Sequence, residues 1–470
     1  MKLFSKTSSP FSLIVFILLI FRGVLNALIP LMDKTEARYA EIARIMAETN
    51  NWITPQIDYG IPFWAKPPLS TWFSAISFEV FGVNEFAARF PYLILSTLMV
   101  FLVGKYAKRK GLNFFIPGVI LLTIPEFLIH AGVVSTDTSL AFCVTLVMLS
   151  FWEGIKENSK TIWKYLFFVG IGLGLLAKGP IIIILTGPPI FFWLIISNKF
   201  KLLWKSFPWI LGILLTSLIA IPWYYIAEIK SEGFINYFIV GEHFKRFLSS
   251  DWKGDKYGFP KSQPLGMIWI FLFLFALPWI QVVIGKFWKK RRSILKDNWA
   301  TYLLLWLLWT PLFFSVSKSL IHPYIMPVMV PIALLATYWW NDIKHSKNII
   351  RASLLFPIII LIFHIGLTIS GKKEFYFKTD KYLIENHSDK NLPIYHWQKK
   401  SYSGQFYSKG KIEAINNNDE LKNKLLQQKS FLVIIPHKKI NKIDPKSIIS
   451  LKEIEVNNDK GIYLFKKSEQ

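Results

Sequence analysis

The stretch FSLIVFILLIFRGVLNALIPLMDKTEARYAEIARIMAET, residues 11–49, joins a long apolar run to a segment dense in charge. The run from Phe11 to Met32 is longer than the roughly 18 residues that suffice to cross a hydrocarbon core of about 30 Å. A secretory signal would have an apolar core of only about 7–15 residues and a small-x-small cleavage site, which this run does not match. We therefore predict an uncleaved first membrane span, although Lys2 and Lys6 precede it as they would precede a signal peptide.

Similar apolar runs recur along the chain, which has 470 residues and is 53% hydrophobic and 18% charged. A soluble domain has about 25% charged residues. The runs begin near Phe11, Phe90, Leu112, Thr138, Trp163, Pro180, Phe207, Leu265, Trp299, Tyr324 and Ala352, which makes eleven candidates. Gly179 followed by Pro180 is a strong breaker and separates two runs that could otherwise merge. We predict a polytopic α-helical membrane protein with about eleven transmembrane helices. The one cysteine, Cys143, excludes disulfides as an organising feature.

The basic residues set the orientation, because cytoplasmic loops carry an excess of lysine and arginine. With the N-terminus inside, every inner loop is short and basic. These loops hold Lys105, Lys108, Arg109, Lys110, Lys156, Lys160, Lys164, Lys199, Lys201, Lys205, Lys286, Lys289, Lys290, Arg291, Arg292, Lys296, Lys344, Lys347 and Arg351. Much of the net charge of +25 is therefore a topological signal, and we predict that nucleic acid is not a partner.

The chain divides into a transmembrane domain, residues 1–370, and a small α/β domain, residues 371–470, which the odd number of spans places outside. The segments LPIYHW (392–397), SFLVIIP (430–436) and GIYLF (461–465) have the pattern of strands. The segment NDELKNKLLQQK (418–429) predicts a helix that opens on an Asn-Asp pair. The lysines of this domain are interpreted as an ordinary solvated surface.

Two outer loops are long, residues 33–89 and 228–263. In the first, residues 36–49 and 68–81 are predicted as amphipathic helices at the membrane interface, so the candidate chemistry lies at headgroup level on the outer face. Asp33 and Glu36 follow the first span, and either carboxylate could act as general base toward an attacking hydroxyl. Their spacing also matches a helix capping box, so the catalytic and capping roles both remain open.

Cationic residues stand beside aromatic residues on the outer side. Lys66 lies in PFWAKPP, Lys178 in AKGP and Lys318 in SVSKS, while Arg246 lies in GEHFKRF and Tyr324 in IHPYIMP. Cations at this depth suit a phosphate, whose oxygens accept charge-assisted hydrogen bonds. The alternative is that each long side chain simply snorkels to water. Asp137, at the start of another span, could bind a substrate or cap its helix.

His243 is a candidate ligand-binding residue, but no tight metal-ligand spacing surrounds it. The sequence also has no P-loop and no G-x-G-x-x-G phosphate cradle, which argues against a nucleotide site. No cofactor is predicted from these patterns, and the dependence on a divalent metal is left open.

The segment TEARYAEIARIMAETNNWITPQIDYGIPFWAKPP (35–68) resembles the first outer loop of the lipid A aminoarabinose transferases and their bacterial protein O-mannosyltransferase-like relatives. The similarity continues in the same order through STDTSLAF, LAKGP, GEHFKRF and FFSVSKSLIHPYIMP, and touches the tail at DELKNKLLQQKSFLVIIP. It implies a GT-C-like fold and an enzyme that uses a polyprenyl-phosphate sugar. It also implies that the acidic pair Asp33 and Glu36 is catalytic. Further roles implied are donor-phosphate binding by Lys66, Arg246 and Tyr324, and cavity lining by Asp137, Lys178, His243 and Lys318.

Two positions depart from that family. The family commonly has an aspartate directly before the glutamate, where this chain has Thr35, so Asp33 and Glu36 both remain candidates for the base. The aminoarabinose enzymes also have a glutamate before the loop lysine that is implicated in metal binding, where this chain has Ala65. We therefore predict no metal site among these residues.

The expected function is transfer of a sugar, such as 4-amino-4-deoxy-L-arabinose, from polyprenyl phosphate to lipid A or another outer-face acceptor. The expected location is the bacterial inner membrane, with the active site facing the periplasm and in contact with membrane lipids. A protein O-glycosyltransferase is one alternative, and a lipid or sugar transporter is another. Transporters place polar residues near the midplane of the membrane. The candidate residues of this chain lie at the outer ends of spans, which favours the enzyme.

Overall fold

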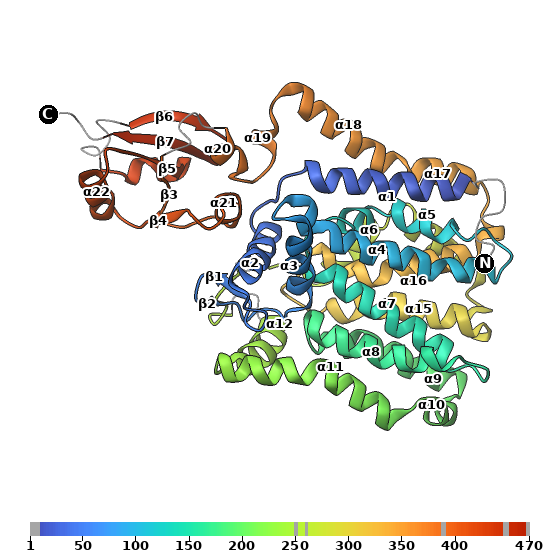
Figure 1. The fold of residues 1–470 in the computed structure, drawn as a ribbon. Helices are drawn as coiled ribbons and strands as arrows, with labels where there is room; N and C mark the ends of the chain where they lie inside the picture. Colours follow the sequence, from blue (N-terminus) through green and yellow to red (C-terminus); the bar gives the residue numbers. More distant parts are fainter. Residues whose placement is uncertain (1–9, 249–251, 259–261, 387–391, 445–450, 467–470) are drawn as a thin grey trace.

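The computed structural model describes residues 10–248, 252–258, 262–386, 392–444 and 451–466. Long helices lie side by side in a bundle, and a small sheet lies beyond one end of that bundle (Figure 1). The short helices α2 and α3 lie at the same end as the sheet, whereas α1 begins at the opposite end (Figure 1).

Each of the eleven predicted apolar runs forms a helix or a pair of consecutive helices. These are α1 (Pro10–Leu28), α4 (Glu85–Lys108), α5 (Ile116–Thr123) with α6 (Pro125–His130), α7 (Thr136–Gly154), α8 (Thr161–Lys178), α9 (Ile181–Ser197), α11 (Trp209–Lys230), α13 (Met267–Phe275) with α14 (Trp279–Lys290), α15 (Asn298–Phe314), η3 (His322–Val328) with α16 (Met329–Tyr338), and α17 (Ser346–Ser353) with α18 (Leu355–Ser370). The predicted break after Lys178 is confirmed: Gly179 has a φ of +78° there, and Pro180 precedes α9.

Fewer than eleven of the described segments are both long enough and apolar enough to cross a membrane. Among the described residues, five helical segments are long and apolar enough to cross a membrane, and a sixth is formed if α13 and α14, bent by 105°, count as one span. The chain is thus a membrane protein with several spanning helices. The count of eleven stays a prediction, because the other apolar runs are shorter, interrupted or, like the 19-residue α7, not apolar enough.

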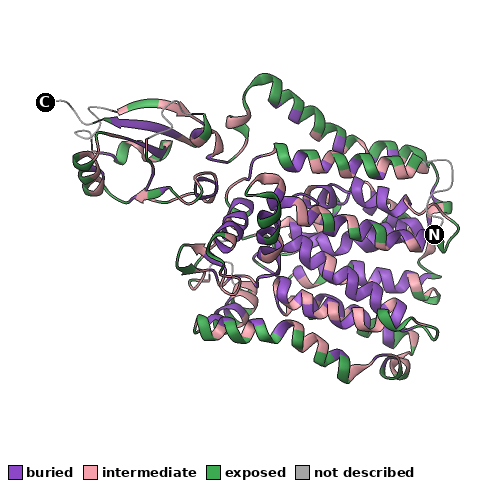
Figure 2. Cartoon of the chain, in the orientation of Figure 1, coloured by how far each residue is buried: buried purple, intermediate pink, exposed green. Residues whose placement is uncertain are grey.

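Burial separates a central helix from helices whose apolar side chains face outward. Almost all of α7 is buried, whereas α11 and α18 are largely exposed (Figure 2). Ile210 on α11 is 86% exposed and Ile369 on α18 is 82% exposed. Such long exposed apolar faces are rare on soluble proteins, and they are expected where hydrocarbon chains replace water.

The basic loops meet at the end of the bundle away from the sheet. Arg109 Nη1 lies 2.6 Å from Glu153 Oε1, and the ammonium of Lys110 lies 3.9 Å from the centre of the Tyr338 ring. Lys290 Nζ pairs with Asp342 at 2.7 Å. The short helix α10 (Phe200–Ser206) and the turns η2 (Ile294–Lys296) and η4 (Trp340–Asp342) belong to these connections.

The first outer loop folds into the two predicted helices with a small hairpin between them. They are α2 (Thr35–Thr49) and α3 (Leu69–Phe81), and the hairpin pairs β1 (Gln56–Asp58) with β2 (Ile61–Pro62). The second outer loop forms η1 (Asn236–Lys245), a π-helix, followed by α12 (Arg246–Leu248). π-helices are rare in proteins, and those that occur are often found at functional sites.

The C-terminal segment forms a five-stranded sheet in the order β4-β3-β5-β7-β6. Its strands are β3 (Ile394–Trp397), β4 (Glu413–Ile415), β5 (Ser430–Pro436), β6 (Leu451–Val456) and β7 (Lys460–Lys466), and its helical elements are α19 (Lys373–Tyr376), α20 (Lys381–Glu385), α21 (Tyr402–Tyr407), α22 (Asn418–Gln427) and η5 (His437–Lys442). The predicted strands and the predicted helix are confirmed, and β4 and β6 are additional. Strand β5 reads as a continuous apolar run because both of its faces are buried.

This C-terminal segment contacts the first outer loop directly. The Tyr407 hydroxyl accepts a hydrogen bond from the Leu31 amide at 2.7 Å, and Lys381 Nζ lies 2.5 Å from Glu85 Oε1. The Phe78 and Phe406 rings lie 6.0 Å apart. The sheet therefore stands on the same side of the bundle as α2 and α3. That residues 371–470 form a domain of their own stays a prediction.

Candidate active site

A cavity of about 1120 Å³ lies where the first outer loop, η1, η3 and the C-terminal segment meet. A drug-sized ligand site occupies about 300–1,000 Å³, so this cavity has room for a large substrate. Seven of the predicted site residues line it: Asp33, Lys66, Asp137, Lys178, His243, Arg246 and Tyr324. These residues come from segments as far apart in sequence as residues 33 and 324, so the fold brings them together.

Asp33 lies at the cavity between α1 and α2. Its two carboxylate oxygens accept hydrogen bonds from Ser403, from the amide at 3.0 Å and from the hydroxyl at 2.5 Å. Burial raises the pKa of the Asp33 carboxyl and the charge of Asp380 raises it further, while Lys460 and the Ser403 hydrogen bonds partly oppose this shift. A fixed carboxylate with a raised pKa at a cavity suits a general base.

Glu36 is placed differently, although it stands three residues further along the chain. It is not among the described residues that line the cavity, and its side chain is 7% exposed. Its carboxylate receives two hydrogen bonds from Arg89, each 2.8 Å long. Arg89 also donates to the carbonyls of Asn26 and Pro30, so the pair joins the end of α1 to α2 and α4.

The structure does not support the interpretation of Asp33 and Glu36 as a helix capping box. Helix α2 begins at Thr35, the residue before it is Lys34, and no side chain caps this end of the helix. Asp33 therefore lies outside the N-cap position. Glu36 Oε2 is 3.4 Å from the amide of Met32, a weak contact beside its pair with Arg89. The structure thus assigns Asp33 to the cavity and Glu36 to a buried ion pair.

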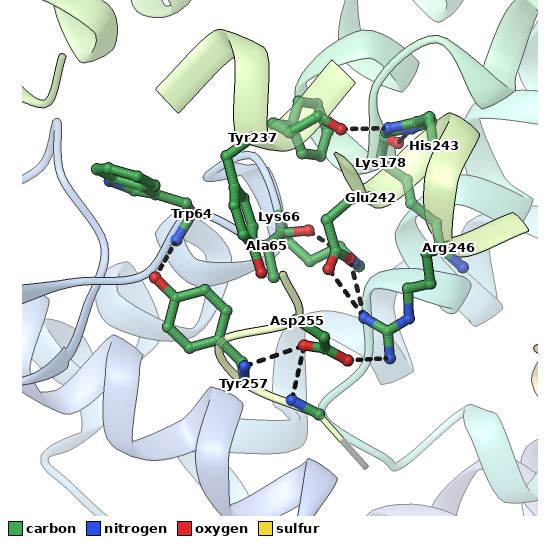
Figure 3. A network of polar contacts seen from close by, with 12 residues as sticks. Trp64, Ala65, Lys66, Lys178, Tyr237, Glu242, His243, Arg246, Asp255 and Tyr257 are labelled. Carbon is green, nitrogen blue, oxygen red and sulfur yellow. Dashed lines mark hydrogen bonds and ion pairs between the residues drawn. The ribbon is translucent and has the colours of Figure 1, made fainter. Parts of the chain in front are cut away.

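Lys66 and Arg246 share one carboxylate that the sequence analysis did not single out (Figure 3). Lys66 Nζ lies 2.9 Å from Glu242 Oε2, and Arg246 Nη1 lies 2.9 Å from Glu242 Oε1. Arg246 Nη2 lies 3.4 Å from Asp255. Burial disfavours the charged form of Glu242, but the two cations outweigh it and hold the pKa of Glu242 below its usual value.

The segment before Lys66 is held by the second outer loop. The Tyr257 hydroxyl donates to the carbonyl of Pro62 at 2.8 Å and accepts from the amide of Trp64 at 3.2 Å. The Trp64 ring packs against Tyr237, with ring centres 5.8 Å apart (Figure 3). Lys66 is 19% exposed and precedes Pro67, which disfavours a helical backbone at Lys66. Its ammonium is therefore fixed at the cavity and does not extend freely into water.

Lys178, Asp137 and Tyr324 form a second charged group in the cavity. Lys178 Nζ lies 2.5 Å from Asp137 Oδ1 and 4.3 Å from the centre of the Tyr324 ring. The N-cap of α7 is Ser135, two residues before Asp137. The Ser135 hydroxyl accepts a hydrogen bond from the Asp137 amide at 3.1 Å. Asp137 is thus not the cap of this helix, and its carboxylate pairs with Lys178.

His243 does not present a free ring nitrogen to the cavity. Its Nδ1 lies 2.8 Å from the carbonyl of Phe238 and its Nε2 lies 3.1 Å from the carbonyl of Lys178. Burial disfavours the charged ring and lowers the pKa of His243. Ala65, which precedes Lys66 where the aminoarabinose enzymes have a glutamate, offers no metal ligand.

Lys318 is exposed, and it is absent from the cavity lining among the described residues although its neighbours Ser317 and Ser319 belong to it. Sequence analysis missed Glu242, Asp255 and Ser403, as well as the lining contributed by residues 374–380 and 457–460. For Glu242 a signal existed, since a glutamate four residues before Arg246 lies on the same helical face. No local pattern marks Ser403, which reaches Asp33 across 370 residues of sequence.

Comparison with known proteins agrees with this architecture. The family model of dolichyl-phosphate-mannose-protein mannosyltransferases matches residues 10–238. The undecaprenyl phosphate-α-4-amino-4-deoxy-L-arabinose arabinosyl transferase of Aeromonas hydrophila is 32% identical over 65% of this chain and 55% of its own length. The relative of the same name from Yersinia pestis is 28% identical over 77% of this chain and 64% of its own length. The chain thus spans just over half the length of the curated relatives it matches.

Among solved structures, ArnT from Cupriavidus metallidurans bound to undecaprenyl phosphate superposes with a TM-score of 0.77 at 18% identity, over 96% of this chain and 97% of that one. The chain is therefore a polytopic membrane protein with the GT-C fold. Within that class, its sequence is similar to part of the arabinosyl transferases, and its fold is that of ArnT.

Proposed function

We propose that the protein is an integral-membrane glycosyltransferase that moves a sugar from polyprenyl phosphate to an acceptor at the outer face of the bacterial inner membrane. The observation that carries this proposal is the cavity itself. It combines the fixed cations Lys66, Arg246 and Lys178 with the carboxylate Asp33 at one end of a membrane-embedded bundle.

The donor phosphate is bound by Lys66, Arg246 and Tyr324. In the structure Glu242 balances the first two cations. A phosphate that enters takes over part of this pairing, and Glu242 keeps both side chains aimed at the cavity. The sugar-linked donor is a phosphodiester with one negative charge. The product is a phosphomonoester whose charge approaches −2 at about pH 7. Cations held in a low-dielectric site therefore stabilise the transition state more than the ground state.

The chemical step follows from this arrangement. An acceptor oxygen attacks the anomeric carbon of the sugar, the bond between that carbon and the phosphate oxygen breaks, and polyprenyl phosphate leaves. A hydroxyl acceptor loses its proton to Asp33. Asp137, Lys178 and His243 line the space available to the sugar and acceptor. Glu36 contributes by holding the first loop in place through Arg89.

The proposed orientation of the cavity rests on the contact between Asp33, after the first span, and Ser403, after the last span. Asp33 follows one span, and Ser403 follows all of them. Their hydrogen bonds require both to lie on one side of the membrane, which needs an odd number of spans in total. With the basic loops in the cytoplasm, the cavity faces the periplasm.

The names of the relatives suggest 4-amino-4-deoxy-L-arabinose as the sugar and undecaprenyl phosphate as its carrier. The resemblance of residues 35–68 to the lipid A aminoarabinose transferases suggests lipid A as the acceptor. A protein hydroxyl is the second candidate acceptor, because the matching family model describes protein mannosyltransferases. A lipid A phosphate has a second pKa near about 6 and is largely ionised at neutral pH, so it scarcely needs a base. A serine, threonine or sugar hydroxyl does need one, and Asp33 favours that class of acceptor.

Purified protein in proteoliposomes tests the proposal. Undecaprenyl phosphate carrying the labelled sugar is supplied with either lipid A or a serine- and threonine-rich peptide, and the products are identified by mass spectrometry. A glycosylated product that depends on Lys66 supports the proposal and identifies the acceptor class. Movement of labelled lipid across the bilayer with no glycosylated product would show a transporter and overturn it.

A further inference from the structure

Three side chains that the proposed reaction does not use converge beside the cavity. Glu126 and His130 lie one helical turn apart on α6, and His322 opens η3. Their ligand atoms all lie within 4.8 Å of one another. Glu126 Oε1 is 3.0 Å from His130 Nε2, and Glu126 Oε2 is 2.9 Å from His322 Nδ1.

Burying these three polar side chains without full hydrogen bonding costs free energy. The Glu126 side chain is 0% exposed and that of His130 is 4% exposed. Neither ring nitrogen of His130 has a partner in hydrogen-bond geometry among the described residues. Buried polar atoms are nearly always satisfied by hydrogen bonds, and buried charges by pairing or by metal ions. A buried imidazole in this state, with Nε2 3.0 Å from a buried carboxylate, is suited to bind a metal ion.

We propose that Glu126, His130 and His322 bind a divalent transition-metal ion, for which Zn²⁺ is the best fit. Two imidazoles and one carboxylate are a recognised zinc ligand set, with ligand distances of about 2.0–2.2 Å. Ligand atoms of a tetrahedral site with these bond lengths stand about 3.3–3.6 Å apart. Two of the present separations are slightly shorter than this, so small side-chain rotations open the site to that size.

The chemistry of the ligands selects the ion. Mg²⁺ and Ca²⁺ prefer oxygen ligands, and two imidazoles disfavour them. Zn²⁺ accepts mixed nitrogen and oxygen ligands, and Glu126 neutralises half of its charge. Three protein ligands leave a fourth position for water. The His322 side chain is 39% exposed, which gives an ion a route to the otherwise buried site.

The ion would join segments that shape the cavity. The carbonyl of His130 accepts a hydrogen bond from Thr138, which follows Asp137, and His322 stands two residues before Tyr324. The site thus links α6 to η3, next to the segments that carry the cavity residues Asp137 and Tyr324. It is separate from the position beside Lys66, where Ala65 and His243 offer no ligand. The inference is independent of the sugar-transfer reaction.

The test uses the full-length protein in detergent. Protein is stripped with a chelator, reloaded with Zn²⁺ and desalted, after which bound zinc is counted by mass spectrometry and thermal unfolding is recorded. Glu126→Gln, His130→Gln and His322→Gln remove one ligand each. His345→Asn is the matched control, since His345 lies outside the cluster and has a φ of +58°, which asparagine tolerates. His243→Gln reports on the cavity position.

We expect one zinc per wild-type chain and a higher Tm with zinc than without it, because an ion that binds only the folded state stabilises that state. The three ligand variants should lose at least about 10- to 100-fold in affinity, since even a lost outer partner of a ligand costs that much. His345→Asn and His243→Gln should bind as the wild type does. X-ray absorption at the zinc edge of wild-type protein should show nitrogen and oxygen ligands at about 2.0–2.2 Å.

Three results would overturn the proposal. The first is a wild-type protein that neither retains zinc nor gains in Tm. The second is loss of zinc in His243→Gln with retention in His322→Gln, which would place the ion in the cavity. The third is an absorption spectrum with oxygen ligands alone. The wild-type measurements decide the matter even where a ligand variant fails to fold.

Discussion

Asp33 and Glu36 are near neighbours in sequence, yet they lie in two regions with different physical character. Asp33 borders the cavity and is held by hydrogen bonds from Ser403 of the C-terminal segment. Glu36 faces the opposite way, into the junction of α1, α2 and α4, where Arg89 pairs with it. A carboxylate that lines a cavity can exchange a proton with a bound substrate, whereas one in a buried bidentate pair holds helices together. Proximity in sequence is therefore a poor guide to a shared role.

The largest expected effect is on turnover at the cavity. Asp33→Asn keeps the size of the side chain and an oxygen that accepts from Ser403, but it removes the base. With a hydroxyl acceptor, the transfer rate should fall by about 10²–10⁴-fold, the usual contribution of general base catalysis. Initial rates in proteoliposomes measure this, with Tm as the check on folding. A folded variant with a near-normal rate would indicate an acceptor that is already ionised.

Next in size is a loss of stability at the buried pair. Glu36→Gln leaves Arg89 buried without its anionic partner, which typically costs about 3–5 kcal/mol. We expect a lower Tm and a smaller yield of folded protein, with turnover per folded molecule largely kept. Glu79→Gln on the exposed face of α3 is the matched control and should leave the Tm unchanged. If Glu36→Gln unfolds like the wild type but turns over slowly, Glu36 acts in catalysis and the contrast with Asp33 fails.

Lys66→Ala tests the cavity from the side of the phosphate. A hydrogen bond to a charged group contributes roughly 1.5–3 kcal/mol, which corresponds to about 10- to 150-fold in rate at about 1.4 kcal/mol per decade. Lys66→Ala should therefore lose at least about tenfold in transfer rate, and Lys66→Arg should recover part of it. Lys318→Ala, which removes an exposed lysine, should stay within about twofold, because surface changes have small effects. Equal losses in the two alanine variants would point to general surface charge and not to a phosphate site.

The smallest effect is a shift in pH dependence. As the proposed base, Asp33 acts when ionised, and its pKa is raised, so the rate should increase with pH through a value above the ordinary aspartate pKa of about 3.9. The Ser403 hydrogen bonds lower this pKa, so Ser403→Ala should move the acid limb of the rate profile to higher pH. A limb that stays in place in Ser403→Ala, with the enzyme folded, would show that Asp33 does not control it.

Much of the secondary structure of this protein could be predicted from local sequence patterns. The apolar runs, the break at Gly179 and Pro180, the helices of the first loop, and the strands β3, β5 and β7 all follow from residues close in sequence, because helix and strand periodicity are local properties. Seven of the predicted site residues lie at one cavity for a related reason: they were chosen at the outer ends of apolar runs, which a membrane aligns at one depth. The short strand β4 and the exposed strand β6 have weaker patterns and were missed.

The sequence by itself determined that the chain spans a membrane, which end of the bundle carries most of the candidate site residues, and which cations and acids are candidates there. Only the tertiary structure decided how these side chains pair. Lys66 meets Glu242 across 176 residues, Ser403 holds Asp33 across 370, and His322 meets Glu126 across 196. The physical reason is the range of the interactions. Hydrophobic length and charge asymmetry act on a segment as a whole, whereas a hydrogen bond or ion pair is decided within about 3–4 Å, a distance that only the packed chain sets.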